Sequence, residues 1–186
     1  MDKLSELVAR SEIQNALCHY ARGVDRRDWD AVRACFHEDA EDEHGEFTGT
    51  VDEFITWVSA RHMHIPFAAH FLGNCLIEFV DDRTALVETY FVAMQRRTAA
   101  ARANAGNGGS AIDELDAEVI GRYLDRFERR DSAWKIAQRR VVYDSSRLTT
   151  STHKPRAAKG ILGTRTPLDP AFNWFSRAER ISDTTE

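Results

Sequence analysis

The chain has 186 residues, of which 42% are hydrophobic and 30% are charged, as in one soluble globular domain. A net charge of −5 without a basic block argues against nucleic-acid binding, and no apolar run approaches the roughly 18 residues of a membrane span. The 3 cysteines show no CxxC spacing and the first residues form no apolar signal core, so we expect a cytoplasmic protein without disulfides or a zinc site.

The first third of the chain has helical periodicity. Apolar residues recur at helical spacing in residues 4–22, 28–36 and 50–64. We expect Gly23 to end the first helix, so that a turn there brings Tyr20 and Asp25 towards one cavity. Thr50 and Glu53 have the spacing of a capping box, which predicts the start of the third helix.

After Pro66 the pattern alternates between apolar and polar residues, which is typical of strands. The predicted strands span residues 68–80, 84–96, 117–129 and 133–146. A short hairpin is also predicted over residues 40–49, and the low-complexity segment 98–110 predicts a loop.

Helices followed by long strands with short connections predict an α+β fold. We expect one domain over residues 1–150, in which the N-terminal helices pack on a strongly curved, mostly antiparallel sheet that forms a cone-shaped barrel. For residues 151–186 we expect a loop and a short aromatic helix after Asp169. We expect this segment to serve as a lid or as an oligomer contact.

The strand that begins at His70 is the first candidate for a functional site. Alternation predicts that His70, Leu72, Asn74 and Leu76 share one face of this strand. One titratable side chain then lies at the end of a largely apolar row. We expect this face to line a pocket in which His70 acts as a base.

Several segments, taken together and in order, resemble the SnoaL-like branch of the nuclear transport factor 2-like superfamily. The segments are Glu12-Ile-Gln-Asn, Gly23-Val-Asp25, Phe36-His-Glu-Asp-Ala40, His70-Phe-Leu-Gly-Asn74, Gly121-Arg-Tyr-Leu-Asp-Arg-Phe and Arg139-Arg-Val-Val-Tyr-Asp144. The resemblance implies a cone-shaped α+β barrel. It covers roughly residues 5–147. Because this fold hosts many functions, the function has to be argued from the site.

The resemblance also implies a catalytic pair. Hexachlorocyclohexane dehydrochlorinase, bile-acid 7α-dehydratase and scytalone dehydratase are cofactor-free lyases of this group. The first two use an aspartate near the end of the first helix and a histidine at the start of the strand after the third helix. Asp25 and His70 hold these positions here. An aspartate that accepts from one ring nitrogen makes the other nitrogen a better base, whereas the alternative is a buried pair that only stabilises the fold.

Further residues are candidates for binding and proton transfer. Tyr20 is a candidate acid for a leaving oxygen, or else an aromatic of the helix stripe. Arg139 resembles a pocket arginine of the dehydrochlorinase and is a candidate to stabilise negative charge; its alternative is an outward charge paired with Glu118 or Glu128. The remaining candidates for substrate binding are Asn74, Tyr123 and Glu88.

We therefore predict a cofactor-independent lyase for a small hydrophobic cyclic or aromatic substrate, with retro-aldol cleavage or isomerisation as related options. The alternative is a non-catalytic binding or assembly module that resembles the small subunit of ring-hydroxylating dioxygenases. No nucleotide motif is present, and His62, His64 and His70 lack the further ligands of a metal set, so we expect neither a cofactor nor a metal. A homo-oligomer, either a dimer or a trimer, is also expected.

Overall fold

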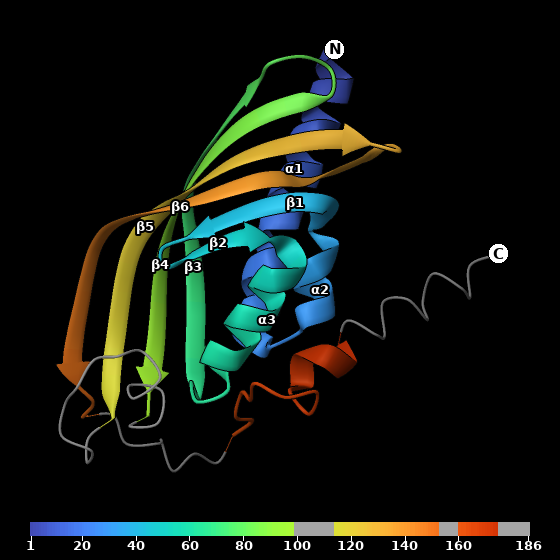
Figure 1. Ribbon diagram of the computed structural model, residues 1–186. Helices are drawn as coiled ribbons and strands as arrows, with labels where there is room; N and C mark the ends of the chain where they lie inside the picture. Colours follow the sequence, from blue (N-terminus) through green and yellow to red (C-terminus); the bar gives the residue numbers. More distant parts are fainter. Residues whose placement is uncertain (99–113, 153–159, 175–186) are drawn as a thin grey trace.

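A computed structural model describes residues 1–98, 114–152 and 160–174. The helices α1 (Lys3–Arg26), α2 (Trp29–Ala34) and α3 (Val51–His62) accompany a sheet of strands β1 (Phe36–His44), β2 (Phe47–Thr50), β3 (Phe67–Phe79), β4 (Thr84–Arg97), β5 (Leu115–Arg130) and β6 (Ala133–Thr150), and a short helical segment follows near the C-terminus. The strand order is β2-β1-β6-β5-β4-β3. Only the pairing of β1 with β6 is parallel among these neighbours. The three helices gather on one side of this sheet (Figure 1), which confirms the α+β class.

Helix α1 does not end at Gly23, so the expected turn is wrong. The helix runs on to Arg26, and Arg27 caps it in the left-handed region, with φ at 56°. Gly23 is buried inside the helix. A Cβ there would lie only 2.7 Å from Cγ2 of Val32. Glycine at this position therefore allows α1 and α2 to pack closely. Residues five apart on a continuous helix point about 140° apart, so Tyr20 and Asp25 face different surroundings.

The segment between α2 and α3 contains more strand than the sequence predicts. Phe36, expected on the second helix, instead begins β1 and pairs in parallel with Ile136 of β6. The expected hairpin is present as β1 and β2. The capping box is also confirmed, because the Thr50 hydroxyl accepts from the Glu53 backbone and the Glu53 carboxylate accepts from the Thr50 backbone.

A bulge in β3 changes the expected faces of that strand. Leu72 pairs with Phe91 but the next aligned partner is Cys75 opposite Thr89, so two residues of β3 oppose one residue of β4. His70, Leu72 and Cys75 consequently share the helix side of the sheet, whereas Asn74 and Leu76 are exposed. The expectation that Asn74 lies beside His70 is wrong, because a bulge inverts the alternation beyond it.

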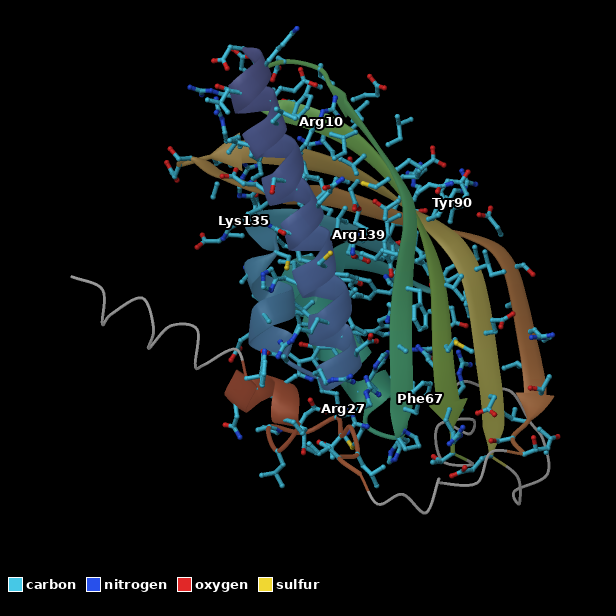
Figure 2. The ribbon with its side chains drawn as sticks, turned by 180° about the vertical axis from the view of Figure 1, so that it is seen from behind. Arg10, Arg27, Phe67, Tyr90, Lys135 and Arg139 are labelled. Atoms are coloured by element: carbon cyan, nitrogen blue, oxygen red, sulfur yellow. The ribbon has the colours of Figure 1, made fainter. Side chains whose placement is uncertain are left out.

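The core fills the space between α1 and the sheet, where Figure 2 shows Arg139, while Tyr90 projects from the opposite face of the sheet. That opposite face carries exposed apolar side chains of β3, β4 and β5. They include Phe71, Leu76, Leu86, Tyr90, Met94, Ile120 and Leu124.

The C-terminal part of the chain is described over residues 160–174. Residues 170–174 are helical, as expected after Asp169, whose side chain accepts from the backbone of Ala171. This segment lies beneath the ends of α1 and α3 in Figure 1. The predicted loop at 98–110 falls outside the described residues except for Thr98.

Candidate active site

The structure brings Asp25 and His70 into direct contact. Asp25 is in the last turn of α1. His70 lies in β3, the edge strand of the sheet, which packs against α1. The Asp25 Oδ1 atom accepts from His70 Nδ1 at 2.7 Å, and Oδ2 accepts from the His70 backbone N–H at 2.9 Å. Both oxygens are used on one residue, so the carboxylate fixes the ring orientation. In the neutral ring this leaves Nε2 as the proton acceptor.

Arg165, which the sequence did not single out, ties the end of α1 to the neighbouring loop. Its Nη2 donates to the Val24 carbonyl at 2.7 Å, its Nε to the Asp25 carbonyl at 2.8 Å, and its Nη1 to the Ile65 carbonyl at 2.5 Å. Val24 and Asp25 lie in the last turn of α1, where the helix itself leaves carbonyls without an intrahelical donor, so Arg165 adds donors at the helix end. Arg165 Nη2 also donates to His62 Nδ1 at 2.8 Å.

The hydrogen bond from Arg165 determines the tautomer of His62. Arginine only donates hydrogen bonds, so His62 Nδ1 must accept and the neutral ring carries its proton on Nε2. Burial, together with the charge of Arg165, holds the pKa of His62 well below its ordinary value. His62 is therefore a neutral hydrogen-bond donor, whereas His70 presents an acceptor.

A cavity of about 120 Å³ lies between α3 and the strands. Its walls combine aromatic and aliphatic side chains with polar ones. The lining residues are His44, Trp57, Val58, Arg61, His62, Ile65, His70, Phe91, Ala93, Gln95, Arg97, Val119, Tyr123 and Tyr143. Three histidines and two arginines make the cavity more polar than the apolar row that alternation in β3 predicts.

Tyr20 and Arg139 form a separate buried cluster. Arg139 Nε and Nη2 donate to the two carboxylate oxygens of Asp125, each at 2.7 Å, and both side chains are 0% exposed. The guanidinium lies 4.1 Å from the ring centroids of Tyr20 and Tyr123. Arg139 thus points inward, but its partner is neither Glu118 nor Glu128. Neither Tyr20 nor Arg139 lines the cavity, whereas Tyr123 does.

The other two predicted binding residues lie away from His70. Asn74 is exposed beyond the bulge. Glu88 accepts from Arg122 at 3.0 Å, and Arg122 also pairs with Asp144 and lies over Tyr90 on the outer face of the sheet. The structure therefore does not bring Asn74 or Glu88 into the cavity.

Sequence reasoning also missed a second histidine–carboxylate pair. His44 Nδ1 lies 3.4 Å from Oδ1 of Asp42, which is 1% exposed, and no aligned hydrogen bond joins the two. The Asp42-x-His44 spacing on one strand is a signal that could have found it, because alternate residues share a face.

Within residues 1–98, 114–152 and 160–174, no three His, Cys, Asp or Glu side chains are grouped to hold a metal ion. Over the same ranges, no helix has the length and apolar character needed to cross a membrane.

The sequence of this chain matches a known family. A family model described as a SnoaL-like domain matches residues 5–140. The chain belongs to the SnoaL-like family. No curated protein matches it in sequence.

Several solved structures share this fold. A candidate scytalone dehydratase from Novosphingobium aromaticivorans has a TM-score of 0.65 at 22% identity, over 86% of this chain and 97% of that chain. A type 2 hexachlorocyclohexane dehydrochlorinase has a TM-score of 0.69 at 19% identity, over 84% and 100%. The β subunit of a candidate aromatic-ring-hydroxylating dioxygenase from N. aromaticivorans has a TM-score of 0.56 at 18% identity, over 75% and 92%. The fold therefore occurs in proteins named as lyases and in a protein named as a subunit.

Proposed function

We propose that this SnoaL-like protein is a cofactor-independent lyase in which His70 is the general base and Asp25 orients it. The observation that carries the proposal is the 2.7 Å contact between His70 Nδ1 and Asp25 Oδ1, made by a histidine that lines the cavity. A positioned base of this kind contributes about 10²- to 10⁴-fold to a rate. The similarity to structures named as a dehydratase and a dehydrochlorinase supports an elimination.

The favoured reaction is the elimination of water from a substrate with an acidic C–H next to a hydroxyl-bearing carbon. His70 Nε2 takes the proton, the C–H electron pair becomes the new double bond, and the hydroxyl leaves with the proton returned from His70. His62 donates from Nε2 to the oxygen that gains negative charge on the substrate. This role replaces the acid role expected for Tyr20, which is 1% exposed and away from the cavity.

The cavity limits the size of the substrate. Its volume of about 120 Å³ is smaller than the roughly 150 Å³ of an engineered cavity that binds benzene. A substrate larger than one ring would therefore require the walls to move. Return of the proton to a different carbon gives isomerisation, and loss of a carbon fragment gives retro-aldol cleavage, by the same base.

The test is a turnover screen of hydroxylated alicyclic and aromatic compounds, followed by ultraviolet absorbance of the unsaturated product. The variants are His70→Gln, Asp25→Asn and, as a matched control, His19→Gln, which changes an exposed histidine on α1. We expect His70→Gln to lose about 10²- to 10⁴-fold in kcat/KM and His19→Gln to match the wild type. If all three variants turn over as the wild type does, His70 is not the base. Complete absence of turnover with tight ligand binding favours the non-catalytic module.

A further inference from the structure

Two arginines line the active-site cavity without serving the Asp25–His70 pair. Arg61 lies in the last turn of α3, and Arg97 is the last residue of β4. We propose that Arg97 and Arg61 form an anion subsite, so that the ligand of this cavity is a small compound carrying a carboxylate. The inference rests on the proposed function only in taking this cavity as the substrate site.

Arg97 is a half-buried cation whose donors are incompletely used. Its Nε is buried and has no hydrogen-bond partner, and its Nη2 donates to the Gln95 side chain at 3.3 Å. Within the described part of the chain, no carboxylate forms an ion pair with Arg97. Buried N–H groups are normally bonded and cations away from water are normally paired, so this guanidinium has capacity for a partner that the described residues do not provide.

Arg61 adds a second positive charge at the same place. Burial, and next the nearby charge of Arg61, lowers the pKa of Arg97. Arg61 lies 4.8 Å over the Trp57 ring and pairs at 3.5 Å with Glu46, whose side chain is 78% exposed. Solvent-exposed pairs of that kind contribute little, so Glu46 does not neutralise the site. Two like charges held together repel each other, and a bound anion removes that repulsion.

The position relative to the base fits one small substrate. His70 pairs with Ala93, and residues 93, 95 and 97 of β4 all line the cavity because alternate residues share a face. One molecule along this row meets His70 at one end and Arg97 at the other. A planar guanidinium matches the two oxygens of a carboxylate, which favours that anion in a cavity of about 120 Å³.

The experiment measures binding of probe ligands to the full-length chain by isothermal titration calorimetry. The probes are propionate and benzoate, with 1-propanol and benzyl alcohol as neutral counterparts. The variants are Arg97→Gln, Arg61→Gln and His70→Gln. The matched control is Arg140→Gln, an exposed arginine of β6 outside the cavity.

We expect at least one carboxylate to bind the wild type about tenfold or more tightly than its alcohol. Arg97→Gln should raise the Kd of that carboxylate by about tenfold or more and leave the alcohol unchanged. Arg61→Gln should have a smaller effect in the same direction, and Arg140→Gln none. Unfolding curves show whether each variant is folded. If Arg97→Gln does not fold, Arg61→Gln still tests the subsite.

Two results would overturn the anion subsite: carboxylates that bind no better than their alcohols, or carboxylate affinity that survives both arginine substitutions. His70→Gln separates this inference from the proposed function. Carboxylate binding should persist in His70→Gln, because the variant removes the base and keeps the arginines. Loss of turnover with retained carboxylate binding supports both proposals, and retained turnover with arginine-dependent binding supports the subsite alone.

Discussion

Replacing Asp125 by Ala removes the carboxylate that neutralises Arg139 in the core. Both side chains are 0% exposed and are joined by two hydrogen bonds of 2.7 Å. The substitution leaves a guanidinium buried among Tyr20 and Tyr123, where water does not reach it. Breaking one side of such a pair costs about 3–5 kcal/mol. That is a large fraction of the roughly 5–15 kcal/mol by which a domain is stable.

The measurement is urea unfolding followed by circular dichroism and by tryptophan fluorescence, with a thermal scan. For a chain of this length, each kcal/mol shifts Tm by about 2–4 °C, so Asp125→Ala should lower Tm by roughly 6–20 °C. Glu43→Ala is the matched control, because Glu43 pairs with the exposed Arg140 on the same strand as Arg139. Exposed pairs contribute about 1 kcal/mol or less.

A second variant separates the charge from the packing. The double substitution Asp125→Leu with Arg139→Met removes both charges and retains apolar volume, so most of the lost stability should return. The reasoning is refuted if Asp125→Ala costs no more than Glu43→Ala. It is also refuted if the double substitution is as unstable as Asp125→Ala, because the loss then comes from packing.

Two further predictions concern stability. Because burial holds the pKa of His62 well below its ordinary value, the unfolded chain binds a proton there that the folded chain does not. The free energy of unfolding should therefore fall as the pH drops below about 6.5, and His62→Gln should flatten this slope by up to about 1.4 kcal/mol per pH unit; equal slopes in the two proteins would contradict the assignment. A Cβ on Gly121 would lie 2.3 Å from the Val142 carbonyl oxygen, so Gly121→Ala should cost about 1–3 kcal/mol. Gly73→Ala, whose nearest contact is 3.6 Å, is its control in the same urea experiment, and similar losses in both would refute the crowding.

The sequence alone determined the features that depend on nearby residues. The helix start at Thr50 and Glu53 follows from a local exchange of hydrogen bonds, and the long strands follow from alternation. The order of helices and strands then determines the α+β class. His70 and Asp25 were also identified before the structure, because the residues around them match a family pattern, and the 2.7 Å contact agrees with that hypothesis.

Only the tertiary structure decided the features that depend on distant residues. The burial of Gly23 follows from packing against Val32, and the inward direction of Arg139 follows from its pairing with Asp125 on the neighbouring strand. The contact of Arg165 with His62 joins residues 103 positions apart. No local pattern encodes such a separation, because the partner is chosen by the packing of whole elements. The bulge after Leu72 is a further example, because it places Asn74 on the opposite face of β3 from His70, and the alternating sequence pattern does not indicate it.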